Sequence, residues 1–280
     1  MYKRQGSSWN QEAYIKASNT GANDQFGWNV STSSDGSRIA VSALHEDSNA
    51  TGINGNQADN SANNSGAVYV FNRSGTTWSQ EAYIKASNTD INDSFGISIS
   101  ISNDGSRLLV GANMEDSSAA GLNGNQADNS DSSAGAAYLF YRTGTVWSQQ
   151  VYIKASNSDA GDLFGENVAI SGDGTSMILS SPNERSIARG INGDQTNNNT
   201  ANSGAAYVFT EIGAVWSQTS YIKASNSDAG DLFGIFVSIN NDGSRVVSGS
   251  RGESSNATGI NGNQDDNSLT GSGAAYIIEN

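Results

Sequence analysis

The stretch Asp93-Ser-Phe-Gly-Ile-Ser-Ile-Ser-Ile-Ser-Asn-Asp-Gly105 contains the signals that decide the fold. Isoleucine alternates with serine from Ile97 to Ser102, and a period of two is typical of a β-strand with one apolar face. The Asn-Asp-Gly that follows favours a tight hairpin, because these residues tolerate positive φ angles. The stretch therefore predicts a strand and the turn that leads into the next strand.

The same pattern occurs four times along the chain. Asp-x-Phe-Gly motifs begin at Asp24, Asp93, Asp162 and Asp231, so each copy starts 69 residues after the previous one. A tryptophan recurs in the same register, at Trp9, Trp78, Trp147 and Trp216. A repeat without insertions or deletions indicates one supersecondary unit that is used four times.

Each unit carries three more strand signals after its first hairpin strand. In the second copy they are residues 107–112, 136–140 and 147–155, and a polar stretch of about 20 residues separates the first two of them. Four antiparallel strands repeated in tandem are typical of β-propeller blades. The sequence therefore predicts an all-β fold, a β-propeller of four-stranded antiparallel blades.

The repeats predict a single propeller-like domain over residues 1–280, with blades at about 26–88, 95–157, 164–226 and 233–280. The last blade lacks its fourth strand, and residues 9–18 carry the pattern of that strand at the other end of the chain. This strand would close a small ring, or the four blades would form an arc of a larger propeller. The lysine that recurs on the fourth strand, as Lys85 in the first blade, is interpreted as a charge that guards an outer edge strand.

Composition narrows the function. The chain has 280 residues, a net charge of −14 and no cysteine, so it cannot form disulfides. No apolar run approaches the roughly 20 residues of a spanning helix, so membrane insertion is not expected. Residues 1–5 contain no secretory signal. They read either as a non-native start of a fragment or as an ordinary start, since Arg4 is in register with Arg73.

Most acidic residues fall in two kinds of loop: the long loop between the second and third strands, and the segment that leads to the next blade. In an up-and-down blade these two loops emerge at the same end. We therefore expect one strongly acidic face and a nearly plain opposite face. An acidic face repels nucleic acid and anionic membranes and attracts cations or basic partners.

Each long loop contains a core such as Gly52–Asp59, in which Asn and Asp alternate around a glycine. Such oxygens are candidate ligands for Ca²⁺. Asx turns that hold the loop without metal explain the same pattern. The candidate metal ligands are Glu46, Asn56, Asp59, Glu115, Asn125, Asp128, Glu184, Asp194, Glu253, Asn263 and Asp266. The candidate ligand-binding residues of the loop face are Asp47, Asn54, Asp116, Asn123, Asn192 and Asn261.

Three motifs resemble a known family. Phe-Gly opens the first strand, Leu-Leu-Val-Gly-Ala follows at 108–112, and Gly-Ala-Val-Tyr-Val-Phe stands at 66–71. Together they resemble the FG-GAP repeat of integrin α subunits and bacterial surface proteins, over the chain from Gly6 on. The resemblance implies a propeller, an extracellular or cell-surface location, and adhesion or ligand binding without a reaction.

One departure from that family concerns calcium. The family often carries a calcium cage in the first hairpin, but here only the Asp-Gly is kept. Around Asp35 the other ligand positions are Ser31, Ser33 and Ile39. Because Ca²⁺ takes six to eight oxygen ligands, these hairpins are predicted to be bare turns.

The sequence favours a non-enzymatic extracellular binding or adhesion module with a protein or glycan ligand, possible calcium assistance, and no nucleic acid. Near-identical units present near-identical loops, whose weak contacts add through avidity. Two alternatives stay open, a carbohydrate-active enzyme and a structural spacer of a larger surface protein. Against an enzyme, the paired carboxylates are equivalent across copies and the sequence shows no Cys/His or Ser/His constellation.

Overall fold

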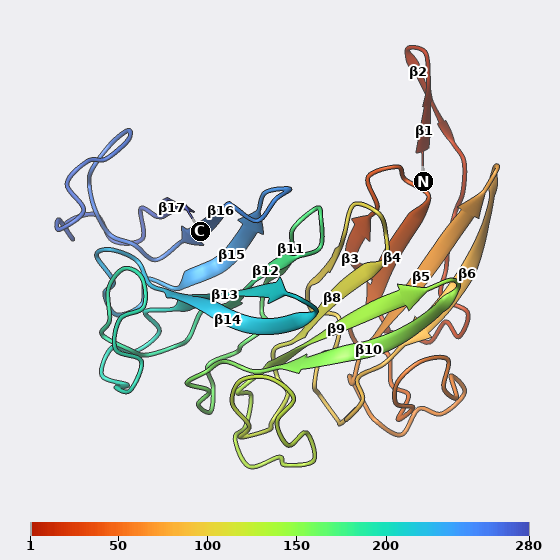
Figure 1. The fold of residues 1–280 in the computed structure, drawn as a ribbon, viewed down its shortest axis with the longest axis horizontal. Helices are drawn as coiled ribbons and strands as arrows, with labels where there is room; N and C mark the ends of the chain where they lie inside the picture. The colour runs from red at the N-terminus through yellow and green to blue at the C-terminus, as the bar shows by residue number, and fades with distance from the viewer. Residues whose placement is uncertain (1, 280) are drawn as a thin grey trace.

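The computed structural model describes residues 2–279, and these residues form strands and loops (Figure 1). Successive antiparallel sheets follow one another as the blades of a four-bladed β-propeller, which confirms the predicted fold class. Within this described range no helix is long and apolar enough to cross a bilayer.

The first two blades each have four strands, paired in chain order. Blade 1 consists of β3 (Phe26–Thr32), β4 (Arg38–Ala43), β5 (Ala67–Ser74) and β6 (Thr77–Ile84). Blade 2 consists of β7 (Ile99–Ile101), β8 (Arg107–Ala112), β9 (Ala136–Thr143) and β10 (Val146–Ile153). The first strand of each blade is innermost, since β7 packs against both β3 and β11.

The last two blades differ in strand number. Blade 3 consists of β11 (Val168–Ile170), β12 (Ser176–Ser181), β13 (Ala205–Ile212) and β14 (Val215–Ile222). Blade 4 has three strands, β15 (Phe233–Ile239), β16 (Arg245–Ser250) and β17 (Ala274–Glu279).

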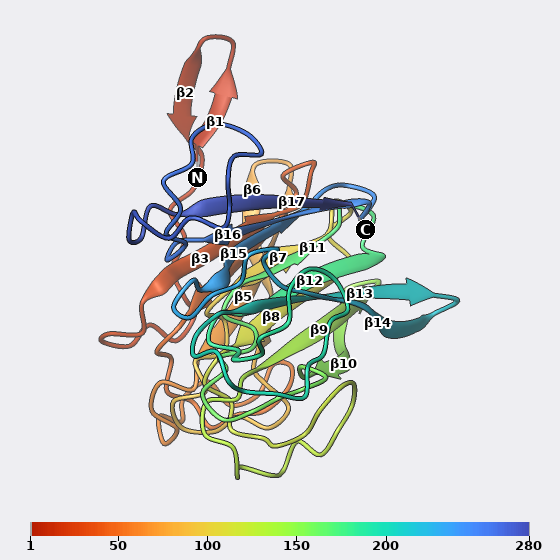
Figure 2. The same cartoon turned by 90° about the vertical axis from the view of Figure 1, so that its left-hand side faces the viewer.

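The N-terminal residues form a separate hairpin of β1 (Tyr2–Gln5) and β2 (Ser8–Gln11), which projects away from the blades (Figures 1 and 2). Of the two predicted alternatives, closure of a ring by residues 9–18 and an open arc, this structure has the arc, because among residues 2–279 β17 pairs with β16 alone. Instead, Glu12 accepts a hydrogen bond from Arg73 at 2.6 Å, and Ala17 packs against blade 1. The blades therefore form an open arc, with the N-terminal hairpin and blade 4 at opposite ends.

Most of the hydrophobic core lies between successive blades. At the joint of blades 1 and 2, Val68 and Val70 share one buried cluster with Phe95, Ile99 and other residues of blade 2. Two similar clusters join blades 2 and 3 and blades 3 and 4. Each sheet therefore depends on its neighbours to cover its apolar side chains.

The serines of the innermost strands also connect blades. The backbone N–H of Val168 donates to Ser98 Oγ, and that of Ile170 donates to Ser100 Oγ, both at 3.1 Å. The polar half of the Ile-Ser alternation thus bonds to the backbone of the following blade. These contacts satisfy buried donors that would otherwise lose their bonds to water.

A close backbone approach explains why the Phe-Gly and Gly-Ala motifs occur together. The Phe164 N–H donates to the Ala134 carbonyl at 3.0 Å, and the neighbouring Gly135 has a φ of 83°. A Cβ added to Gly135 would lie 2.2 Å from the Phe164 carbonyl oxygen. Only glycine fits there, and Gly66 and Gly204 occupy the same place at the other joints with 2.1 Å.

The close approach predicts a large cost for Gly135→Ala compared with Gly121→Ala. Both glycines have positive φ, at 83° and 72°, but a Cβ at Gly121 would meet nothing within 4 Å. The positive φ costs each variant about 1–2 kcal/mol. We expect Gly135→Ala to lose at least about 2 kcal/mol more, as measured by urea unfolding. Equal losses in the two variants would contradict this account of the motif.

Candidate functional site

The long loops and the segments between blades lie on one face of the arc, the long-loop face. The Asn92 N–H, between blades 1 and 2, donates to the Asn63 carbonyl of the first long loop at 2.8 Å. Asn88 Nδ2 donates to the Gln126 carbonyl of the second long loop at 3.1 Å. The loops predicted to emerge together do so, and hydrogen bonds join them into one surface.

A buried ion pair holds the base of each complete long loop. In blade 2, Lys154 Nζ lies 2.9 Å from Glu115 Oε2. The Tyr152 hydroxyl donates to Glu115 Oε1 at 2.8 Å, and Asn88 Nδ2 donates to the same oxygen at 2.9 Å. The carboxylate therefore connects the loop, the fourth strand and the segment that enters the blade.

The same arrangement recurs in the neighbouring blades, as Lys85 on Glu46 at 2.9 Å and Lys223 on Glu184 at 2.6 Å. These lysine side chains are inaccessible to solvent. Burial lowers the pKa of Lys154, and the facing Glu115 carboxylate opposes that shift. The interpretation of the recurring lysine as an exposed guard of an edge strand is therefore wrong.

The surroundings of the loop glutamates do not match those of a calcium ligand. Each of Glu46, Glu115 and Glu184 has its oxygens occupied by a lysine, a tyrosine hydroxyl and an asparagine amide. Glu253 is buried and accepts from Asn226 Nδ2 at 3.0 Å. Over residues 2–279, no group of three or more His, Cys, Asp or Glu side chains is placed to hold a metal ion. These residues do not fit a calcium cage.

The other candidate metal ligands form Asx turns at the surface. Asp59 Oδ1 accepts from the backbone N–H of Ser61 at 2.8 Å and from its hydroxyl at 2.6 Å. Asn56 accepts from the Ala58 N–H at 3.1 Å. The same kind of hydrogen bond, in which the side-chain oxygen accepts the backbone N–H two residues later, is formed by Asn125, Asp128, Asp194, Asn263 and Asp266. The turn interpretation accounts for the pattern, since each side chain closes its own loop.

The predicted ligand-binding residues divide into two groups. Asn54, Asn123 and Asn192 have positive φ, and their side chains accept the N–H of Tyr83, Tyr152 and Tyr221. Asn261 has the same backbone conformation. Asp47 and Asp116 each accept a backbone N–H through one oxygen, at 2.8 and 2.7 Å. They are partly exposed, so their remaining oxygens face the surface.

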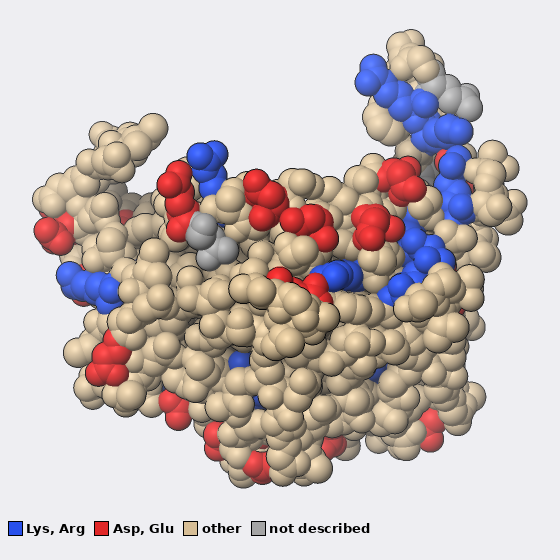
Figure 3. Space-filling view, viewed as in Figure 1, with Lys and Arg blue, Asp and Glu red and all other residues tan. Residues whose placement is uncertain are grey.

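The acidic residues are less concentrated on the long-loop face than the sequence predicts. Eight acidic residues assigned to the loop face are buried: Asp24, Asp93, Asp162, Asp231, Glu46, Glu115, Glu184 and Glu253. Figure 3 shows acidic side chains at the upper edge of the view as well as at the lower edge. The first hairpins of the blades, with Asp35 and its equivalents, lie at the upper edge in Figure 1. The opposite face is therefore not plain.

The aspartate before each Phe-Gly is buried beside the glutamate of the loop base. Burial raises the pKa of Asp93 to about 7, and the negative charge of Glu115 contributes. Burial also raises the pKa of Asp162 to about 7, with help from Glu184. The Asp93 carboxylate also accepts a backbone hydrogen bond, from the Asp90 N–H at 2.8 Å.

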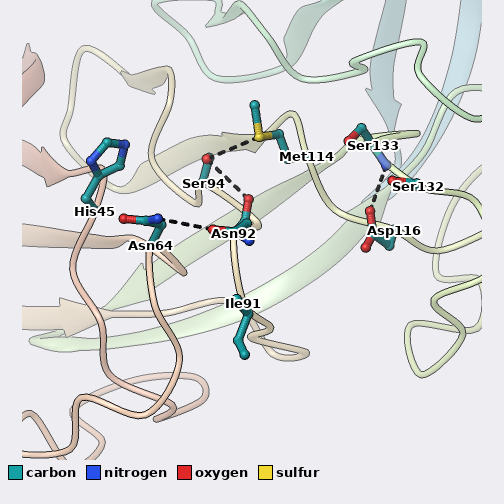
Figure 4. Close-up of a pocket in the computed structure, with 9 residues that line it drawn as sticks. All are labelled: His45, Asn64, Ile91, Asn92, Ser94, Met114, Asp116, Ser132 and Ser133. Carbon is teal, nitrogen blue, oxygen red and sulfur yellow. Dashed lines mark hydrogen bonds between the residues drawn. The ribbon is translucent and has the colours of Figure 1, made fainter.

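A cleft of about 480 Å³ opens between blades 1 and 2 on the long-loop side (Figure 4). Asn64 Nδ2 donates to Asn92 Oδ1 at 3.1 Å on one wall, and Asp116 accepts the Ser133 N–H on the other. The further lining residues are His45, Ile91, Ser94, Met114 and Ser132. Of the predicted ligand-binding residues, Asp116 is the one that lines this cleft.

Sequence reasoning missed that the recurring lysine and tyrosine belong to the loop base. The signal was present, because Lys85 follows Glu46 by 39 residues and Lys154 follows Glu115 by the same interval. Opposite charges at a fixed separation in every repeat indicate a pair that the fold brings together. The tyrosines two residues before each lysine repeat in the same way.

A model of the FG-GAP repeat matches residues 9–71, 78–140 and 147–209, which is more than half of the chain. The chain belongs to the FG-GAP repeat family. The second and third matched segments each run from the fourth strand of one blade through the third strand of the next, so the FG-GAP repeat is offset from the blade by one strand. The first segment begins in β2 of the N-terminal hairpin and ends in the third strand of blade 1. A search of curated proteins found no match.

Two solved structures are among those similar to this FG-GAP protein. Hydrazine synthase of Kuenenia stuttgartiensis has a TM-score of 0.44 at 14% identity, over 85% of this chain and 45% of that chain. A Bacteroides uniformis protein, assigned by its name to the 6-phosphogluconolactonases, has a TM-score of 0.36 at 12% identity, over 85% of this chain and 69% of that chain. These TM-scores are too low to carry an argument about function.

The buried pairs predict that Lys154→Met is strongly destabilising. Removing one partner leaves the Glu115 charge uncompensated, which typically costs about 3–5 kcal/mol. Arg189→Met is the matched control, because Arg189 pairs with Asp228 at 3.5 Å with both side chains about half exposed. We expect the control to lose less than about 1 kcal/mol in chemical denaturation. A mild effect at Lys154 would show that the pair does not hold the loop base.

The buried aspartates predict a pH dependence of a defined sign. The pKa of Asp93 is about 7 in the folded chain against an ordinary value of 3.8, so folding takes up a proton between these pH values. The stability contribution of Asp93 therefore falls as the pH rises from about 4 to about 7. Asp93→Asn is expected to remove the Asp93 share of this pH dependence, on the order of a few kcal/mol over the range, while Asp162 keeps its own share; unfolding measured across that range checks it.

Asp35→Asn is the control for the pH experiment. The Ser33 hydroxyl and the Ser37 backbone lower the pKa of Asp35 to about 2, so Asp35 stays ionised throughout that range. Its replacement should leave the slope between pH 4 and 7 unchanged. An unchanged slope in Asp93→Asn would mean that Asp93 is also ionised throughout.

Proposed function

We propose that this FG-GAP protein is a non-enzymatic binding module that holds a protein or glycan ligand on its long-loop face. The supporting observation is the buried pair at each loop base, such as Lys154 on Glu115. Anchored bases with polar tips present the same Asn and Asp groups several times in one orientation. Contacts that are weak singly then add, because binding at one loop raises the effective concentration at the next.

The ligand chemistry follows from the charge. The chain carries −14, and the long loops end in carboxylates and amides at the surface. These groups suit basic protein surfaces or the hydroxyls of a glycan, and they disfavour nucleic acid and anionic lipid. The proposed location is extracellular or on the cell surface, with a role in adhesion, by analogy with the integrin-like members of the family.

Binding is favoured over catalysis by the state of the recurring acids. A catalytic carboxylate must be free to exchange a proton or attack a substrate. Glu46, Glu115 and Glu184 are instead covered by lysine and tyrosine. Calcium assistance at the surface Asn and Asp residues stays a prediction, which isothermal titration calorimetry with Ca²⁺ checks.

The test neutralises one surface carboxylate in each long loop by replacing Asp59, Asp128, Asp194 and Asp266 with Asn. Asparagine keeps the oxygen that closes each Asx turn, so the loops should hold while four charges are lost. We expect at least about a tenfold loss of binding to a basic protein surface or to the glycan identified on an array. The readout is surface plasmon resonance.

The matched control makes the same change on the opposite face, with Asn in place of Asp35, Asp104, Asp173 and Asp242. These residues close equivalent turns with Ser or Thr two positions later. The control should bind as the unchanged chain does. Equal losses of binding in the two variants would mean that net charge causes the effect. Unchanged binding by the long-loop variant would exclude this face as the binding site.

A further inference from the structure

The cleft between blades 1 and 2 is lined by side chains that the other joints do not share. Ser94 lines the cleft, whereas Leu163 and Leu232 hold its position at the next two joints. The three residues have the same backbone conformation, with φ of 58°, 59° and 55°. The backbone therefore does not require a serine here, and the serine leaves room where the other joints carry a larger side chain.

The charge at the cleft also differs between joints. Asp116 lines the cleft, whereas Arg185 holds its position at the next joint. Arg185 Nη2 lies 3.8 Å from the point that a Cβ on Gly161 would occupy, and Gly161 is the repeat equivalent of Asn92. Asn183 Nδ2 also donates to the Gly161 carbonyl, at 3.1 Å. Between blades 2 and 3 the chain's own polar side chains thus approach this position, whereas between blades 1 and 2 a cleft of about 480 Å³ is open to a ligand.

Hydrogen bonds within the chain hold both walls of the cleft (Figure 4). On one wall the Asn92 N–H donates to the Asn63 carbonyl at 2.8 Å, and Asn92 Oδ1 accepts from Asn64 Nδ2 at 3.1 Å. On the other wall Asp116 Oδ1 accepts the Ser133 N–H at 2.7 Å. The polar groups are therefore oriented before a ligand arrives, which lowers the entropy that binding costs.

Several polar atoms of the cleft keep unused hydrogen-bonding capacity. Within residues 2–279, Asp116 Oδ2, Asn92 Nδ2 and the Ser132 hydroxyl form no hydrogen bond. The carboxylate oxygen is an acceptor, the amide nitrogen is a donor, and the hydroxyl is both. Beside them Ile91 and Met114 are 52% and 43% exposed. The cleft thus combines free donors, free acceptors and a small apolar surface.

We propose that this cleft binds one uncharged hexopyranose residue of a glycan. Each sugar hydroxyl both donates and accepts, so neighbouring hydroxyls pair with Asp116 Oδ2, Asn92 Nδ2 and the Ser132 hydroxyl together. The C–H surface of the sugar ring packs on Ile91 and Met114. This inference rests on the proposed function and names the ligand class of the long-loop face.

Charged ligands fit the same groups less well. An ammonium or guanidinium group has no acceptor, so it would leave the donors of Asn92 and Ser132 unpaired. An acidic sugar would bring its carboxylate against Asp116 in a chain of net charge −14. The size of the cleft suits a sugar, because sites for small molecules typically have volumes of about 300–1,000 Å³.

The single histidine of the chain makes the site observable. His45 lines the cleft, and the sequence contains one histidine. Its imidazole Hε1 signal in the NMR spectrum of the untagged chain therefore reports on occupancy. The probes are free glucose, galactose, mannose, fucose, N-acetylglucosamine and N-acetylgalactosamine. We expect at least one of them to shift this signal saturably, with a dissociation constant on the order of 1–10 mM.

Two variants copied from the chain's own repeats test the location. Ser94→Leu places the leucine of the other joints in the cleft, and Asp116→Arg places the arginine of the next joint there. Each should raise the dissociation constant of the sugar at least about tenfold, because the new side chain occupies the sugar's space. Asp265→Arg makes the same charge change at an exposed residue of the fourth long loop. This control should stay within about twofold of the unchanged chain.

Three results would overturn the inference. The first is that no sugar of the panel shifts the His45 signal. The second is that the shift survives both Ser94→Leu and Asp116→Arg. The third is that N-acetylarginine amide binds in place of the sugars and weakens as NaCl is raised from about 50 to about 500 mM, which would identify a cation site. Binding of an uncharged sugar should be the same at both salt concentrations.

The free sugar also separates this inference from the proposed function. The variant with Asn in all four loop tips leaves the cleft intact, so it should bind the free sugar as the unchanged chain does. If Ser94→Leu leaves binding of a protein or an immobilised glycan unchanged, the inference is overturned and the proposed binding module stands. If the free sugar shifts His45 while the loop-tip variant loses no ligand, the loop tips are excluded and the inference stands.

Discussion

The middle strands of the blades carry apolar side chains on both faces, and a blade alone can cover neither face. Three hydrophobic clusters accordingly lie at the joints, each with side chains from two successive blades. A fourth joins the outer face of blade 1 to Ala17 and Ile15 of the N-terminal segment. Stability in such an array is a sum over blades and their neighbour contacts, so an interior blade gains twice what a terminal blade gains. The exposed Val30 and Ile277 at the two ends are the direct consequence of this constraint.

The joints also require close backbone contact, which the motif residues permit. Gly135 lets the third strand of blade 2 meet Phe164 of blade 3 without a Cβ between them. The phenylalanine then packs on Tyr207, with ring centroids 5.4 Å apart in an edge arrangement. The Phe-Gly and Gly-Ala halves of the repeat are therefore two sides of one contact between blades.

The buried Glu–Lys pair transfers this rigidity to the surface loops. Breaking such a pair is costly because it leaves a charge in a low-dielectric interior, whereas its net contribution to stability is often small. Its main effect here is geometric, since Glu115 connects a long loop, a fourth strand and the preceding linker. A loop of about 20 residues is then anchored at its base by buried protein groups.

The sequence by itself determined the blades, their strands and the turn at each Asp-Gly, because these depend on local alternation and on an unbroken 69-residue repeat. It also determined which loops emerge on the same face, because strand direction alone decides on which face a loop emerges. Only the tertiary structure decided that Lys85, Lys154 and Lys223 point inward and pair with the loop glutamates. It also decided that Glu12 and Ala17 contact blade 1, whereas Ser8–Gln11 pair in a separate hairpin. The reason is that burial and charge pairing depend on which repeats lie side by side. An alternation of side chains along a strand does not distinguish a face that a neighbouring blade covers from one that solvent reaches.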